Sequence, residues 1–153
     1  MSVGKTKSKN YARMKQLLDE PEVRTWRAIM EAFQLTFVQL QKGLMEEGLH
    51  VSRFQILFYL YFEGSMSAVD LSRKLLVTRG NVSTFIKRLE KDSQISVCPT
   101  STSMSRPLYR LTENAEKWFE EIFPRHIRRV KLLVPSLPGN TLSTLKKIGR
   151  KES

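Results

Sequence analysis

Residues 78–90 read Thr78-Arg-Gly-Asn-Val-Ser-Thr-Phe-Ile-Lys-Arg-Leu-Glu90, and this stretch decides the fold. Its apolar residues recur at i, i+3, i+4 and i+7, which is the spacing of a helix with one buried face. These residues are Val82, Phe85, Ile86 and Leu89. Thr78 is the expected N-cap, because a threonine hydroxyl accepts a hydrogen bond from the first turn. With the apolar face turned inward, the outer face is polar and basic and has no acid. It consists of Arg79, Gly80, Asn81, Ser83, Thr84, Lys87, Arg88 and Lys91.

The segments on either side of this helix complete a compact motif. Ser67 and Asp70 form a capping box that opens a short helix, and Ser52 with Gln55 is expected to open the helix before it. After this helix, apolar and polar residues alternate in two short stretches on either side of a polar tip. Ile95 and Val97 are the apolar residues of the first stretch, and Tyr109 and Leu111 are those of the second. Alternation of this kind predicts a hairpin. Residues 51–111 are therefore predicted to be a winged helix-turn-helix, with a three-helix core and a two-stranded β wing, in a mainly α chain.

The flanks predict further helices. Residues 1–18 form a basic N-terminal arm with a short helix near its end, and residues 19–50 form a long helix that Asp19 and Pro21 open. Apolar residues follow that helix at alternating spacings of three and four, as in a coiled-coil seam. We call this set the heptad seam: Val23, Trp26, Met30, Phe33, Phe37, Leu40 and Leu44. It fits a subunit interface, with purely intramolecular core packing as the alternative. Residues 112–153 are expected to supply C-terminal dimerisation helices, the first capped by Thr112 and kinked or broken at Pro124.

Composition limits the function. Lys and Arg number 26 against 15 Asp and Glu in 153 residues, giving a formal net charge of +11. This excess is typical of a protein that binds a polyanion. The single cysteine, Cys98, cannot form an internal disulfide, which fits a cytoplasmic protein. We expect no membrane span, metal, cofactor or enzymatic activity, because no apolar run, ligand cluster or catalytic motif is present.

The outer face of residues 79–91 suits double-stranded DNA. Short hydroxyl and amide groups and long cations read base edges in a major groove about 12 Å wide, and N–H groups at helix starts can contact phosphates. Gly80 would let the first turn approach the backbone, and Arg106 would reach the minor groove from the wing. The expected DNA-binding residues are Ser67, Thr78, Arg79, Gly80, Asn81, Ser83, Thr84, Lys87, Arg88 and Arg106. One alternative is a winged-helix module that binds RNA or protein without operator specificity. Another is membrane attachment through the basic residues of the arm.

Four stretches resemble the multiple antibiotic resistance regulator (MarR) family. They are Leu49-His-Val-Ser-Arg-Phe-Gln-Ile-Leu, Ala68-Val-Asp-Leu-Ser-Arg-Lys-Leu, Val82-Ser-Thr-Phe-Ile-Lys-Arg-Leu-Glu90 and Leu111-Thr-Glu-Asn-Ala. The resemblance covers about residues 20–148 and implies a homodimer on a pseudo-palindromic operator. In many relatives a small aromatic effector, often a phenolic anion, releases the DNA. Residues that would line such a pocket, although core packing explains them equally well, are Trp26, Phe33, Phe58 and Tyr61.

Two departures from the family pattern fall near the wing. Where the family usually has Asp-Arg-Arg before the second wing strand, this chain has Ser103-Met104-Ser105, with Arg106 one place late. The wing tip is therefore expected to be less strongly anchored by charge than is usual in the family. Where the family has a glycine after the recognition helix, this chain has Ser93-Gln94. Some relatives sense oxidants through a cysteine, but those cysteines lie near the start of the long first helix, so an ordinary structural thiol is favoured for Cys98.

Overall fold

The computed structural model describes residues 10–99 and 106–150. The chain divides after Gln39 into two compact units, residues 1–39 and 40–153, and each is described by itself. The described chain is mainly helical and contains one small antiparallel sheet, which confirms the fold class expected from the sequence. Within these residues, no helix is both long enough and apolar enough to cross a bilayer.

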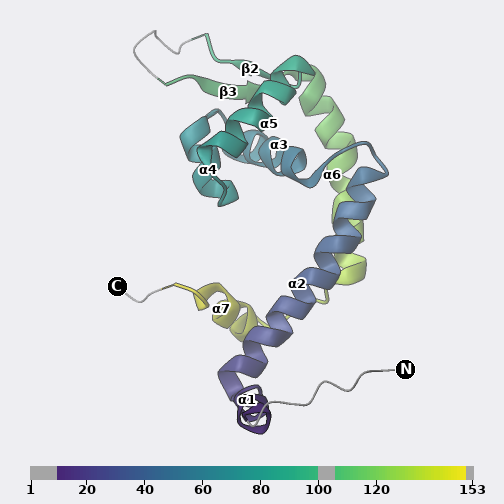
Figure 1. The fold of residues 1–153 in the computed structure, drawn as a ribbon. Coiled ribbons are helices and arrows are strands. Elements are labelled where there is room, and N and C mark those ends of the chain that lie inside the picture. Colours follow the sequence, from purple (N-terminus) through teal and green to yellow (C-terminus); the bar gives the residue numbers. More distant parts are fainter. Residues whose placement is uncertain (1–9, 100–105, 151–153) are drawn as a thin grey trace, which may run out of the picture. The chain divides into compact units, whose positions relative to one another are not determined.

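The second unit contains the winged helix-turn-helix. Its elements in chain order are α3 (Val51–Glu63), β1 (Met66–Ser67), α4 (Ala68–Leu75), α5 (Arg79–Lys91), β2 (Ile95–Val97) and β3 (Leu108–Leu111). Figure 1 shows α3, α4 and α5 gathered beside the β2–β3 hairpin. The expected succession of helix, short helix, helix and hairpin is confirmed.

The sheet has a third strand that the sequence did not predict. β1 pairs antiparallel with β3, so the strand order is β1-β3-β2. Met66 lies opposite Tyr109 in one ladder, and Ile95 lies opposite Leu111 in the other. Because β1 leads directly into α4, this pairing joins the base of the wing to the start of the helix-turn-helix.

One apolar core holds these elements together. Its largest fully buried side chains are Phe119, Leu44, Leu49, Ile56, Leu57, Leu71, Leu89, Ile122 and Val82. Burying one such side chain contributes about 1.5–3 kcal/mol relative to leaving it exposed. The core therefore fixes which face of α5 turns inward.

The start of α3 differs from the expectation. The cap is His50 rather than Ser52, because the His50 ring nitrogen Nδ1 accepts a hydrogen bond from the Ser52 N–H at 3.4 Å. The expected capping box of Ser52 and Gln55 is therefore wrong, since both residues lie inside the helix. Gly48, which precedes this cap, has the left-handed conformation (φ 72°) expected for the residue that ends the previous helix.

α6 (Glu113–Leu133) begins at its expected cap, where the Thr112 hydroxyl accepts from the Ala115 N–H at 3.3 Å. Of the kink or break expected at Pro124, the break is wrong, because α6 continues from Glu113 to Leu133 through this proline. Proline removes one helical donor. Phe119 and Ile122 are nevertheless almost fully buried just before it, so packing holds the helix in register. α7 (Gly139–Lys147) is a second helix within residues 112–153, where the sequence predicted C-terminal helices.

The first unit consists of α1 (Tyr11–Leu17) and most of α2 (Pro21–Met45), whose last turns belong to the second unit. The helix start at Pro21 is as expected. Much of the heptad seam is exposed: Trp26 is 62% and Phe33 is 56% accessible to solvent. The first nine residues of the expected basic arm lie outside the described residues.

Candidate nucleic-acid interface

α5 is positioned as the sequence predicted. Val82 and Leu89 are fully buried, Ile86 is 3% exposed and Phe85 packs against the same core. The Thr78 hydroxyl caps the helix by accepting from the Asn81 N–H at 3.4 Å. Cap and core together fix the rotation of α5 about its axis, and so fix which side chains face outward.

The outer face of α5 is open to solvent along its length. The exposed residues on it are Arg79, Gly80, Asn81, Ser83, Thr84, Lys87, Arg88 and Lys91. Its cations make no ion pair within the described residues. Arg53, Arg73, Lys74, Arg125 and Arg129 do have acidic partners at 4 Å or less. α5 therefore offers positive charge that the chain itself does not neutralise.

The space at the first turn of α5 also favours close approach of a DNA backbone. A Cβ added at Gly80 would meet only the Thr78 Oγ1, at 4.0 Å. The fold therefore does not require glycine here. One turn later, the Thr84 hydroxyl donates to the Gly80 carbonyl at 3.1 Å, which leaves the hydroxyl oxygen able to accept.

Ser67 is the weakest of the expected contacts. It is 7% exposed, and its hydroxyl both accepts from the Asp70 N–H at 3.2 Å and donates to the Asp70 carboxylate at 2.6 Å. This hydrogen bond, supported by the charges of Arg73 and Arg106, lowers the pKa of Asp70. The ionised Asp70 opposes a phosphate at the start of α4, so the role of Ser67 is to cap α4.

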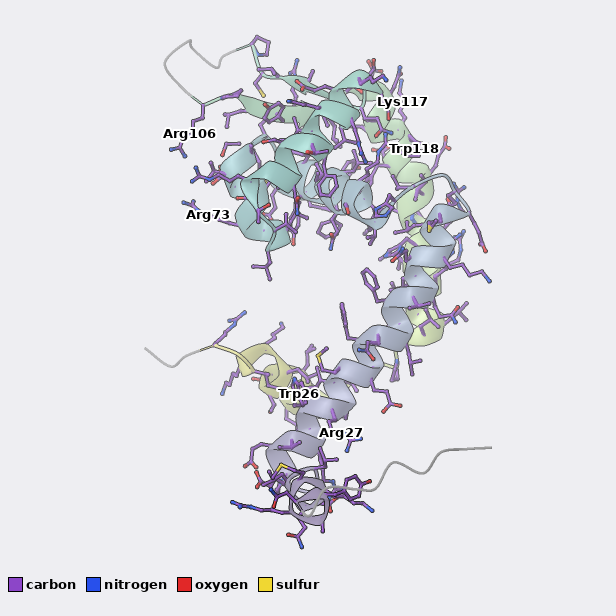
Figure 2. All side chains as sticks on the ribbon, viewed as in Figure 1. Trp26, Arg27, Arg73, Arg106, Lys117 and Trp118 are labelled. Atoms are coloured by element: carbon purple, nitrogen blue, oxygen red, sulfur yellow. The ribbon has the colours of Figure 1, made fainter. Side chains whose placement is uncertain are left out.

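Arg73 is a cation that the sequence reasoning missed. It lies on α4 with a side chain 75% exposed, 3.6 Å from Asp70. Arg106, which precedes β3 on the wing, also acts on the charge of Asp70, and Figure 2 shows Arg73 and Arg106 on the same side of the winged region. The departure at Ser103-Met104-Ser105 lies outside the described residues. Arg73 widens the basic surface from α5 to the junction of α4 and the wing.

The residues expected to bind an aromatic ligand fall into two groups. Phe58 and Tyr61 lie on α3 in one aromatic cluster with Phe62, Phe119 and Phe123, with neighbouring ring centroids 4.9–6.1 Å apart. A shallow pocket of about 270 Å³ opens beside it, lined by Tyr61, Phe62, Phe119, Glu120, Phe123 and Pro124. Trp26 and Phe33 lie on the part of α2 that belongs to the first unit.

Cys98 and the metal-ligating residue types are the remaining candidates for a second site. Cys98 is buried, and its thiol lies 3.3 Å from the Ser65 hydroxyl. Among the residues that the structure describes, no three His, Cys, Asp or Glu side chains come together as a metal site.

Comparison with known proteins identifies the region just described. Residues 49–106 match the model of the MarR family. The HTH-type transcriptional regulator YkoM of Bacillus subtilis is 25% identical over 135 residues, covering 85% of this chain and 87% of that protein. The winged region of this chain is therefore similar to the MarR family. The relative is named as a transcriptional regulator, and the match to the family model covers the winged helix-turn-helix of this chain.

Solved structures show the same MarR-family fold. AbsC, a MarR-family transcriptional regulator from Streptomyces coelicolor, superposes with a TM-score of 0.73 at 24% identity, covering 84% of this chain and 88% of that chain. BpsR of Bordetella bronchiseptica, whose DNA binding is regulated by 6-hydroxynicotinic acid, superposes with a TM-score of 0.68 at 19% identity, covering 82% and 93%. The match extends well beyond the winged region.

Proposed function

We propose that the protein is a homodimer that binds a pseudo-palindromic operator in double-stranded DNA. The observation that carries the proposal is the outer face of α5, which is exposed, basic and unpaired within the described chain. A helix of this kind fits the major groove, where Lys87, Arg88 and Asn81 would meet base edges. Thr78, Arg79, Ser83, Thr84 and Arg106 would add contacts around them, with Arg73 on the sugar-phosphate backbone.

The exposed part of the heptad seam, in the first unit, supports the homodimer. Trp26, Phe33 and Met30 of the first unit are between 38% and 62% exposed. Separately, α7 of the second unit exposes Leu142, Leu145 and Ile148 by 38–50%. Apolar surface on this scale is typical of a protein–protein interface. A second copy of the same chain is the simplest partner, because two-fold symmetry would place two α5 helices about one helical turn, roughly 34 Å, apart on DNA.

Selection of bound sequences from a pool of random duplexes tests this function. The proposal expects recovered sequences to share two inverted half-sites about one helical turn apart. It also expects such a duplex to outcompete structured or single-stranded RNA of equal length at physiological salt. Recovery of no shared sequence, with RNA competing equally well, would instead support the nonspecific RNA- or protein-binding module and reject operator binding.

We further propose that a small aromatic ligand regulates this binding from the pocket beside Phe58 and Tyr61. The regulation of BpsR by 6-hydroxynicotinic acid supports a ligand of this size. The only charged residue lining this pocket is Glu120, whose carboxylate accepts from the Tyr61 hydroxyl at 2.8 Å. A neutral phenol therefore suits the pocket better than a carboxylate. Titrating phenol and benzoate into the protein–duplex complex tests this preference for a neutral ligand. Release of the duplex by benzoate but not by phenol would contradict it.

A further inference from the structure

The end of α5 is tied to α3 by one arginine. The Arg53 Nη2 donates to the Asp92 carboxylate at 2.5 Å and to the Gln94 side-chain oxygen at 2.7 Å. Arg53 lies on the first turn of α3, whereas Asp92 is the C-cap of α5 and Gln94 precedes β2. The Arg53 side chain is 25% exposed, so these contacts are partly shielded from water. A planar guanidinium that bonds two acceptors at once holds both in a defined geometry.

The turn that Arg53 holds has an unusual backbone. Ser93 has φ 54°, in the left-handed region that favours glycine. The turn closes through hydrogen bonds from the Ser93 N–H to the Glu90 carbonyl and from the Gln94 N–H to the Leu89 carbonyl, at 2.9 and 2.8 Å. A serine in this conformation needs support from its surroundings.

α6 supplies that support from the opposite side. The Thr112 hydroxyl donates to the Ser93 carbonyl at 2.8 Å, and the Thr112 N–H donates to the Gln94 carbonyl at 3.0 Å. Thr112 is also the N-cap of α6. The turn 92–94 is therefore held between α3 and the start of α6, and it fixes where α5 ends.

We propose that Arg53 is a positioning residue for sequence recognition, which sets the tilt of α5 without touching DNA. This inference rests on the proposed operator binding. α5 is about 20 Å long at 1.5 Å per residue, so a tilt of about 5° about one end moves the other by roughly 1.7 Å. Hydrogen bonds to base edges weaken steeply with such displacements, whereas flexible cations can still reach phosphates. Loss of Arg53 should therefore reduce specific binding more than nonspecific binding.

The test compares Arg53→Gln, Arg53→Lys and the charge-matched control Arg128→Gln, which removes an exposed cation from α6. The probes are the best duplex from the random-pool selection and a scrambled duplex of the same composition. Arg53→Gln should bind the selected duplex about tenfold or more weakly, a change of about 1.4 kcal/mol, with less than about a twofold change on the scrambled duplex. Arg53→Lys should recover part of the loss, because one donor is kept. Arg128→Gln should change both affinities alike and only slightly.

A salt titration decides whether Arg53 positions α5 or contacts the DNA backbone itself. Equal loss on both duplexes, with the salt dependence of binding reduced by about one phosphate contact, would show that Arg53 touches the backbone and overturn the proposal. No loss on the selected duplex would also overturn it, while leaving operator binding intact. Failure of the wild-type protein to prefer the selected duplex rejects operator binding itself. Should Arg53→Gln not fold, Asp92→Asn removes the paired charge from the other side, and the same loss of preference is expected.

Discussion

Replacing Lys87 should separate DNA recognition from folding. Lys87 is exposed on the outer face of α5 and has no ion-pair partner within the described chain. Alanine is also a better helix former than lysine. The Lys87→Ala variant should therefore change the free energy of unfolding by no more than about 0.5 kcal/mol.

The expected loss in DNA binding is much larger. A cation that contacts a base edge contributes about 1–3 kcal/mol, which corresponds to roughly 5- to 150-fold in Kd for one half-site. A symmetric dimer uses two copies of Lys87, and well-separated effects add. The full operator should therefore lose about 2–6 kcal/mol, twice the loss on a half-site duplex.

Fluorescence anisotropy of a labelled selected duplex measures this loss, with thermal unfolding run in parallel. Lys117→Ala is the matched control, because Lys117 is an exposed lysine of α6 that pairs with Glu113 at 2.7 Å. Figure 2 shows Lys117 on the side of the winged region away from Arg73 and Arg106. The reasoning is refuted if Lys87→Ala binds like the wild type, or if Lys117→Ala loses as much. Equal losses on selected and random duplexes would assign Lys87 to phosphate instead of bases.

Three further predictions concern other parts of the chain. Gly80→Ala should raise the free energy of unfolding by up to about 1 kcal/mol, because the added Cβ meets open space. The same variant should bind duplex DNA more weakly, because the added methyl group keeps the first turn of α5 away from the DNA backbone. An unchanged affinity would contradict close contact between this turn and DNA. Burial lowers the pKa of His126, and so does the charge of Arg129, although the charge of Glu47 opposes the shift. The unfolded chain therefore binds a proton at His126 more readily than the folded chain does. The free energy of unfolding should fall as the pH drops below about 6.5 and level off below the folded-state pKa. Denaturant midpoints at several pH values should show this fall in the wild type and lose much of it in His126→Gln. Phe33→Asp should give a monomer by analytical ultracentrifugation while Gln34→Asp stays dimeric, and a dimeric Phe33→Asp would remove the heptad seam from the interface.

Local signals in the sequence were enough to predict the recognition helix. The cap at Thr78 and the apolar spacing of Val82, Ile86 and Leu89 depend only on residues within one helix, and the structure confirms both. The outward direction of the polar face follows from that spacing. The same local reasoning also found the caps at Ser67 and Thr112.

The errors arose where distant residues decide the structure. β1 is only two residues long and exists because β3 lies beside it, so no alternation in the sequence reveals it. α6 continues through Pro124 because packing of Phe119 and Ile122 outweighs one missing hydrogen bond. The Arg53 contacts join residues 39 and 41 positions apart, which no local pattern predicts.

The cap of α3 shows a different limit. Ser52 is a much commoner N-cap than histidine, and Gln55 follows at the capping-box spacing, so local statistics favoured the wrong residue. The structure places the His50 ring over the helix start instead. Arg73 was missed because its surroundings, Asp70 and the part of the wing near Arg106, come together only in the folded chain.

Protection of one engineered thiol tests the central claim most directly. Ser83 is exposed in the middle of the outer face of α5, and the native Cys98 is buried, so Ser83→Cys adds a single reactive thiol to the described surface. A maleimide should modify this thiol rapidly in the free protein and slowly when a mixed-sequence duplex is bound at low salt. The same thiol placed on α6 by Glu121→Cys should react equally with and without DNA. A Ser83→Cys thiol that is already blocked in the free protein, or that DNA leaves fully reactive, would contradict the assignment of α5 to the duplex.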